Sequence, residues 1–186
     1  AKKHGVTVSL DTNYRSKLWS IEKASRVIGE LMRYTDICIT NPGDIKDLFG
    51  IVSDKADFDL KKPDNEGAAS VAEKLMKRYP LKGAALTLRT NLSASDNDFG
   101  AMLCDGETAV FSRKYRMHIA DRVGGGDAFA AGLIYSLLKQ KAPQDAVEFA
   151  TAAAVLKHSI EGDFNRVAAA EVENLAGGDG SGRVQR

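Results

Sequence analysis

The stretch DRVGGGDAFAAGLIYSLL, residues 121–138, combines three consecutive glycines with an aspartate at the start of an apolar pattern. Apolar residues recur after the glycines at helical spacing, which places the glycines at a helix N-terminus. Free N–H groups and the positive end of the helix dipole gather there, so Gly124, Gly125 and Gly126 could hold a phosphate directly on the backbone. The glycines also indicate a backbone that needs φ > 0 or a close approach that a Cβ would exclude.

Asp127 follows the glycines and has two interpretations. A carboxylate in the first turn can cap a helix and complement its dipole, which is the common role of a Gly-Asp pair. Beside a bound anion, added negative charge is better suited to accept the proton of a hydroxyl nucleophile. No Gly-Lys-Ser/Thr follows, which excludes a Walker A loop, and Phe129 takes the third glycine position of a G-x-G-x-x-G motif.

The segment DRVGGGDAFAAG resembles the C-terminal signature of the ribokinase-like carbohydrate kinases, commonly Asp-Thr-x-Gly-Ala-Gly-Asp followed by a helix. The resemblance implies an α/β fold with a mostly parallel sheet flanked by helices, ATP and Mg²⁺ as cofactors, and phosphoryl transfer to a sugar hydroxyl. It implies that the amides of Gly124, Gly125 and Gly126 stabilise the transferring phosphoryl group, and that Asp127 removes the hydroxyl proton. Arg122 replaces the usual threonine, and Gly125 replaces the usual alanine.

A second motif, SLDTNYRSKLW in residues 9–19, follows a predicted strand at the edge where open α/β sheets bind ligands. In the simplest interpretation, Asn13 caps the next helix and Arg15 is solvated. The Asp-x-Asn-x-Arg…Leu-Trp pattern resembles the 2-keto-3-deoxygluconate kinases of the family. That resemblance implies that Arg15 binds the carboxylate of a sugar acid, with Asn13 and Tyr14 beside it, and that Asp163 in HSIEGDFN is a further substrate-side residue.

The same resemblance assigns the nucleotide and the metal to residues that follow the other strands. Asn41 and Asp44 in NPGD stand where the family has Asn-x-x-Glu, which organises magnesium and phosphates through water, although the motif is also a turn with a helix cap. Thr87 and Arg89 leave the third strand where the family has a Thr-x-Gly nucleotide-binding turn, and Arg89, which replaces the glycine, could approach the ATP phosphates or simply cover the end of the sheet. Thr151 falls where the family contacts the nucleoside, and a buried threonine bonded to its own helix is the alternative.

The remaining pattern alternates strands and helices, which indicates a parallel sheet built from right-handed crossovers. We expect a helix end in AKKHG, a hairpin at DGE, and two C-terminal helices, the second of which begins at a proline. The expected strands are residues 6–10, 36–40 and 83–89, and the expected helices include residues 17–34, 41–50 and 68–79.

Composition narrows the partners of this 186-residue chain. Its 26 Lys and Arg nearly balance its 25 Asp and Glu, so no overall field attracts nucleic acid or a membrane surface. We expect small-molecule partners, a sugar acid and ATP, in a cytoplasmic enzyme, and a homo-oligomer is left open. Cys38 and Cys104 lack metal-ligand spacing and are expected as buried reduced thiols, while the three histidines are expected at the surface or at helix ends.

The two ends of the chain also carry expectations. The first residues, AKKHG, have the basic last turn and terminal glycine of a helix C-terminus. We therefore expect the N-terminal lid and first strands of the family to be absent, and the isolated chain to be incomplete as an enzyme. Residues 1–175 are expected to form the C-terminal nucleotide-binding part of a ribokinase-like domain, and residues 176–186 a flexible tail. Two alternatives stay open: a kinase for a neutral sugar such as fructose or ribose, and a non-catalytic nucleotide-binding fragment.

Overall fold

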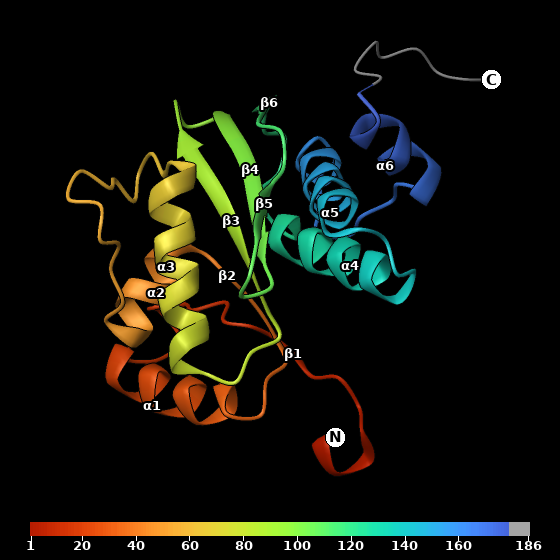
Figure 1. Ribbon diagram of the computed structural model, residues 1–186. Coiled ribbons are helices and arrows are strands. Elements are labelled where there is room, and N and C mark those ends of the chain that lie inside the picture. The colour runs from red at the N-terminus through yellow and green to blue at the C-terminus, as the bar shows by residue number, and fades with distance from the viewer. Residues whose placement is uncertain (179–186) are drawn as a thin grey trace. The chain divides into compact units, whose positions relative to one another are not determined.

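The computed structural model describes residues 1–178, and the chain in it divides into two compact units. Unit 1 comprises Ala1–Thr90 and Ala101–Phe111, and unit 2 comprises Asn91–Gly100 and the chain from Ser112 on. Each unit has its own helices, and one strand, Asp96–Cys104, contributes residues to both units (Figure 1). The predicted domain of residues 1–175 stays a prediction, and most of the predicted tail lies outside the described residues.

Unit 1 is built on a sheet with the strand order β1-β2-β3-β4-β5. The strands β1 (Ser9–Asp11), β2 (Ile37–Thr40) and β3 (Gly83–Asn91) run parallel, as the strand and helix alternation predicted. The strand β4 (Asp96–Cys104) pairs its last residues antiparallel with β5 (Ala109–Phe111). The Asp-Gly hairpin between them is confirmed.

Three helices cover one face of that sheet, and each begins at a polar cap. The helices are α1 (Ile21–Met32), α2 (Pro42–Phe49) and α3 (Asn65–Arg78), and their N-caps are Ser20, Asn41 and Asp64. Figure 1 shows the three helices grouped beside the strands of this unit. Alternate residues of β3 point to the same face, so their apolar side chains share one core with the helices. That core includes Ile28, Met32, Cys38, Ile45, Phe49, Val71, Leu75, Ala84, Leu86, Leu88 and Met102.

Unit 2 pairs β6 (Tyr115–His118) with the first residues of β4 and adds three helices. These are α4 (Gly125–Leu138), α5 (Pro143–His158) and α6 (Ala169–Ala176). The backbones of α4 and α5 approach closely, because a Cβ on Gly132 would lie 3.0 Å from the Ala150 Cα. A small core of α5 and α6 side chains, including Phe149 and Val172, holds the last helix.

Several element boundaries differ from the sequence prediction. The first strand covers only Ser9–Asp11 because the chain before it is held by a side chain: the Val8 N–H donates to Asp36 Oδ2 at 2.9 Å. The first long helix begins at Ile21 rather than at residue 17 because the Ser20 hydroxyl accepts from Lys23 N–H. The strand β6 and the helix α6 were not predicted. The expectation of two C-terminal helices is wrong, because the described residues form three: α4, α5 and α6.

Candidate active site

The glycine turn at the start of α4 lies in unit 2, and no side chain caps it. Gly124 is the N-cap residue, and its φ of 80° is the left-handed conformation that favours glycine, as the sequence predicted. The Gly125 N–H donates to the Arg122 carbonyl oxygen at 3.5 Å, while the N–H groups of Gly126 and Asp127 lie at the positive end of the helix dipole, where they can serve as backbone donors. Asp127 is exposed in this same turn, and the capping role that the sequence left open is not filled by its carboxylate.

Gly125 and Gly126 differ in what an added side chain would meet. A Cβ on Gly125 would lie 2.7 Å from Nε2 and 2.9 Å from Nδ1 of His158, whereas a Cβ on Gly126 would meet open space. His158 does lie at a helix end, but it is fully buried, and its Nδ1 is 2.6 Å from the Ala154 carbonyl oxygen. The space where a side chain on Gly125 would lie is thus filled by an imidazole ring.

Gly124 is restricted by two other groups. A Cβ there would overlap the backbone carbonyl oxygen of Asp163 and lie 3.2 Å from Cε of Lys157. The side chain of Asp163 is exposed, while Lys157 is fully buried. Asp163, a predicted substrate-side residue, therefore reaches the glycine turn through its backbone.

Asp121 ties the glycine turn to the loop after α5. Its carboxylate accepts the N–H groups of Val123 and Gly162, both at 2.9 Å. These backbone donors lower the pKa of Asp121 because they stabilise the ionised form. The N–H of Ala120 donates to the His158 carbonyl oxygen at 2.8 Å, which adds a third link. The sequence motif used Asp121 only as its first residue, whereas in the structure its carboxylate binds the glycine turn to the loop after α5.

Arg122, which replaces the threonine of the family pattern, has a local structural role. Its Nη2 donates to the Ala94 carbonyl oxygen at 2.6 Å and lies 3.4 Å from the Asn97 Oδ1. Asn97 is fully buried. The substitution thus joins the glycine turn to the turn that precedes β4.

In unit 1, a hydroxyl and carboxylate network connects the ends of β1 and β2. The Thr12 and Thr40 hydroxyls are 2.9 Å apart, and Thr12 also donates to Asp44 Oδ2 at 2.9 Å. The Tyr14 N–H donates to the same Asp44 oxygen at 3.3 Å. Thr12 is buried and central to this network, and sequence reasoning missed it although it stands inside the SLDTNYR motif.

Asn41 and Thr87 flank that network at the carboxyl ends of β2 and β3. The Asn41 Oδ1 accepts the Asp44 N–H at 2.9 Å, so Asn41 is the cap of α2, one of its two predicted interpretations. The Thr87 hydroxyl donates to the Thr40 carbonyl oxygen at 3.4 Å. Arg89 is half-buried two residues further along β3.

The residues assigned to the sugar acid lie just beyond β1. Asn13 is exposed and has a φ of 39°, a left-handed conformation that asparagine tolerates better than most residues. Arg15 is exposed as well, and its Nη1 donates to the Tyr14 carbonyl oxygen at 2.9 Å. Unit 1 therefore brings Asn13, Tyr14, Arg15, Asn41, Asp44 and Thr87 to the carboxyl ends of adjacent parallel strands.

Thr151 is placed differently from the other predicted nucleotide residues. It is fully buried in α5, and its hydroxyl donates to the Val147 carbonyl oxygen one turn earlier at 2.7 Å. This geometry is the alternative that the sequence allowed, a threonine bonded to its own helix.

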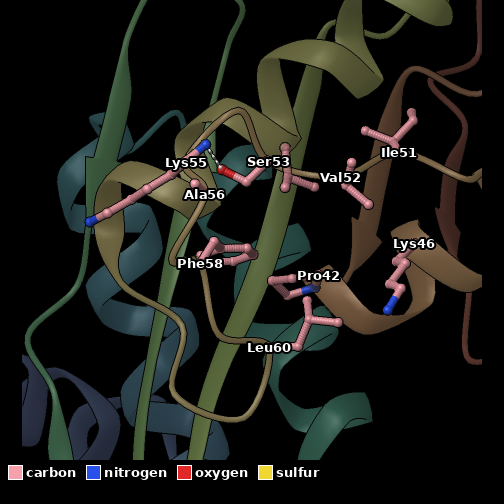
Figure 2. Close-up of a pocket in the computed structure, with 10 residues that line it drawn as sticks. Pro42, Lys46, Ile51, Val52, Ser53, Lys55, Ala56, Phe58 and Leu60 are labelled. Atoms are coloured by element: carbon pink, nitrogen blue, oxygen red, sulfur yellow. Dashed lines mark hydrogen bonds between the residues drawn. The ribbon is translucent and has the colours of Figure 1, made fainter.

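A cavity of about 280 Å³ opens in unit 1 between the start of α2 and the loop 51–60 (Figure 2). Its walls are mainly apolar, with Pro42 and Leu60 on one side and Phe58 beside them in the close-up. The ring of Phe58 occupies the place where a side chain on Gly67 would lie, so the loop 51–60 packs closely against α3. No residue that the sequence assigned to a site lines this cavity.

Residues 1–178 show neither a cluster of metal ligands nor a membrane-spanning helix. No group of three or more His, Cys, Asp and Glu side chains in that range could hold a metal ion. None of the helices described there is long and apolar enough to cross a bilayer. Cys38 and Cys104 are buried free thiols, as predicted, and burial raises the pKa of Cys38 to about 12.

A family model described as pfkB family carbohydrate kinase matches residues 1–165 of the chain. A curated relative from Haloferax volcanii, named 2-dehydro-3-deoxygalactonokinase, is 27% identical over 180 residues, which are 96% of this chain and 50% of the relative. The chain spans about half the length of the curated relative it matches.

Solved structures give the same result for the fold. The 2-dehydro-3-deoxygluconokinase of Thermotoga maritima has a TM-score of 0.88 and 41% identity, over 96% of this chain and 53% of that one. A ribokinase of Arabidopsis thaliana, solved with ribose and ATP, has a TM-score of 0.63 and 21% identity, over 94% of this chain and 49% of that one. The expected ribokinase-like α/β fold is confirmed.

Proposed function

Because the chain belongs to the pfkB family of carbohydrate kinases, we propose that the protein containing it transfers the γ-phosphate of ATP to a hydroxyl of 2-keto-3-deoxygluconate. One observation carries the proposal: the uncapped N-terminus of α4, with an exposed carboxylate in its first turn. Phosphoryl transfer needs backbone donors for developing negative charge and an acceptor for the hydroxyl proton, and this turn offers both.

In this proposal Asp127 is the general base and the turn of Gly124, Gly125 and Gly126 is the anion hole. The exposed Asp127 carboxylate has the freedom to accept the proton of a sugar hydroxyl as the hydroxyl oxygen attacks phosphorus. The first-turn N–H groups then stabilise the charge on the phosphoryl oxygens, and the dipole of α4 adds to their effect. The resemblance stated from the sequence supports these roles.

The sugar-acid specificity is assigned to Arg15, with Asn13, Tyr14 and Asp163 as further substrate residues. A guanidinium can bind a carboxylate with two parallel hydrogen bonds, a contact that a neutral sugar does not require. The exposed Arg15 makes one hydrogen bond to a backbone carbonyl, which leaves other N–H donors for a ligand. The names of the Thermotoga and Haloferax relatives, both kinases of 2-keto-3-deoxy sugar acids, support this substrate class.

ATP is assigned to Asn41, Thr87, Arg89 and Thr151, and Mg²⁺ indirectly to Asp44. A single carboxylate suits Mg²⁺, because this ion keeps several waters and takes further oxygens from phosphates. The Asp44 Oδ2 is used by Thr12 and Tyr14, so the other oxygen is the one that could face a magnesium-bound water. Bound Mg²⁺ would neutralise phosphate charge. Thr151 is the weakest of these assignments, because its hydroxyl is bonded within α5.

A kinase for a neutral sugar is the alternative proposal, which the resemblance of the glycine motif to ribokinase-like kinases leaves open. A non-catalytic nucleotide-binding fragment is the alternative from another class. We place the enzyme in the cytoplasm, where ATP is available. A homo-oligomer is left open, and measuring the molar mass of the native protein would decide it.

The test is an ADP-release assay of the natural full-length product that contains residues 1–186. It compares 2-keto-3-deoxygluconate and 2-keto-3-deoxygalactonate with ribose and fructose. Turnover with a sugar acid supports the proposal, and turnover confined to the neutral sugars favours the alternative. ATP binding without turnover of any of them would favour the non-catalytic module.

Asp127→Asn tests the base directly. We expect kcat to fall by about 10²–10⁴-fold with ATP affinity unchanged, because a general base contributes about that much. Asp145→Asn is the matched control, since Asp145 is an exposed aspartate in the first turn of α5. A variant Asp127→Asn that keeps the activity of the Asp145→Asn control would remove Asp127 from the base role.

A further inference from the structure

Two consecutive titratable side chains, Lys157 and His158, are fully buried at the end of α5. The proposed function uses neither of them. Lysine is among the residues least often buried, because removing an ammonium group from water is costly unless it is compensated. A fully buried lysine beside a candidate phosphate site therefore requires a physical reason.

The side chain of Lys157 lies between the loop that follows α5 and the glycine turn. Its Nζ donates to the Ile160 carbonyl oxygen at 3.0 Å. Its Cε lies 3.2 Å from the position that a Cβ on Gly124 would take, so the end of the side chain packs against that glycine. Its charge is also close enough to Asp121 to help lower the pKa of that carboxyl.

These contacts hold together two segments that form the turn. Asp121 binds the N–H of Gly162, and the Asp163 carbonyl oxygen lies against Gly124. Lys157 donates to the carbonyl oxygen of Ile160, which lies in the chain between the end of α5 and Gly162. The ammonium thus bonds the same loop whose Asp163 carbonyl oxygen lies against Gly124.

Electrostatics adds a second effect. A positive charge that is screened from water acts over a longer range than a solvated one, because the effective dielectric constant is lower. The N-terminus of α4, which no side chain caps, already carries a partial positive charge from the helix dipole. A buried ammonium beneath Gly124 increases the positive potential at the same place, where a phosphate would sit.

We propose that Lys157 is a positioning residue of the phosphate site: its buried ammonium fixes the loop 159–163 against Gly124 and adds positive potential to the N-terminus of α4. The proposal rests on the proposed function, because it needs a phosphate at that turn. The ligand chemistry it favours is a polyphosphate chain rather than the nucleoside to which the chain is attached.

The experiment measures binding of tripolyphosphate and of adenosine to the natural full-length product by calorimetry. Lys157→Met removes the charge at nearly constant length, and Lys157→Gln keeps an N–H donor for Ile160 without the charge. Lys157→Arg keeps the charge. Lys139→Met is the control, since Lys139 is an exposed lysine at the end of α4. Thermal unfolding of each variant shows that it is folded.

We expect Lys157→Met and Lys157→Gln to bind tripolyphosphate about tenfold or more weakly, because the positive potential at the turn is lost, with adenosine affinity unchanged. Lys157→Arg should lose less than either, and Lys139→Met nothing. Equal binding of tripolyphosphate by the wild type and both neutral variants would overturn the proposal. An equal loss of tripolyphosphate and adenosine binding would overturn it as well, because it would show a structural role only. A wild type that does not bind tripolyphosphate would instead refute the phosphate site of the proposed function.

Discussion

Gly125→Ala is expected to destabilise the protein, even though alanine is the usual residue at this position of the family signature. A Cβ on Gly125 would lie 2.7 Å from Nε2 of the fully buried His158, closer than real Cβ contacts come. Overpacking of this kind costs about 1–3 kcal/mol. For a chain of this size each kcal/mol lowers the Tm by about 2–4 °C, so we expect a decrease of about 2–12 °C.

Gly126→Ala is the matched control, because the same methyl group one residue later meets open space. In a helix alanine is favoured over glycine by up to about 1 kcal/mol, so this variant should be as stable as the wild type or slightly more stable. The measurement is urea and thermal unfolding of both variants in parallel. Equal stability of Gly125→Ala and Gly126→Ala would refute the steric argument.

His158→Ala supplies the second half of the test. Truncating the imidazole removes the atoms that a Cβ on Gly125 would meet, so Gly125→Ala should cost less in the His158→Ala background than in the wild type. Residues in direct contact show coupling free energies of about 0.5–3 kcal/mol in such double-mutant cycles. Additive effects of the two substitutions would mean that the two positions do not constrain each other.

Three further predictions concern unit 1. Arg15→Ala should raise KM for the sugar acid by about tenfold to more than a hundredfold, the value of a charge-assisted bond, and leave KM for ATP unchanged; an Arg26→Ala control at an exposed arginine should change neither, and equal effects on both substrates would move Arg15 to the phosphate side. Hydrogen bonds from Lys2 and from the Val8 N–H lower the pKa of Asp36, so its stabilising contribution is present above the unfolded-state pKa of 3.8 and is lost as pH falls below it. Asp36→Asn should therefore flatten acid unfolding in that range, and an unchanged acid transition would contradict the assignment. The pKa of about 12 leaves only about one Cys38 thiol in 10⁴ ionised near pH 8, so a thiol reagent should label Cys38 only after unfolding; rapid labelling of the native protein would contradict its burial.

The local chemistry of the glycine turn could be predicted from sequence because it depends on neighbours along the chain. Consecutive glycines before an apolar helical pattern predict a helix N-terminus, and the structure begins α4 at Gly125 with a left-handed Gly124. The proline start of α5 and the Asp-Gly hairpin were predicted for the same reason. The alternation of strands and helices likewise determined the parallel pairing of β1, β2 and β3.

Boundaries and weak elements could not be predicted, because partners distant in the sequence decide them. The carboxylate of Asp36 holds Val8 outside the first strand, an interaction across 28 residues that no local pattern reveals. The strand β6 has four residues and exists because the first part of β4 offers an edge to pair with. The helix α6 is short, and its apolar face is stabilised by packing against α5 rather than by its own propensity.

The sequence by itself determined which residue types could perform phosphoryl chemistry, since glycine and aspartate carry their conformational freedom and charge wherever they are placed. Only the tertiary structure decided what each glycine accommodates: the carbonyl of Asp163 at Gly124, the ring of His158 at Gly125, and open space at Gly126. It also placed the buried Lys157 beneath the turn and the Thr12 hydroxyl on Asp44. The physical reason is that steric exclusion and burial depend on atoms brought close by folding, and sequence spacing does not specify those distances.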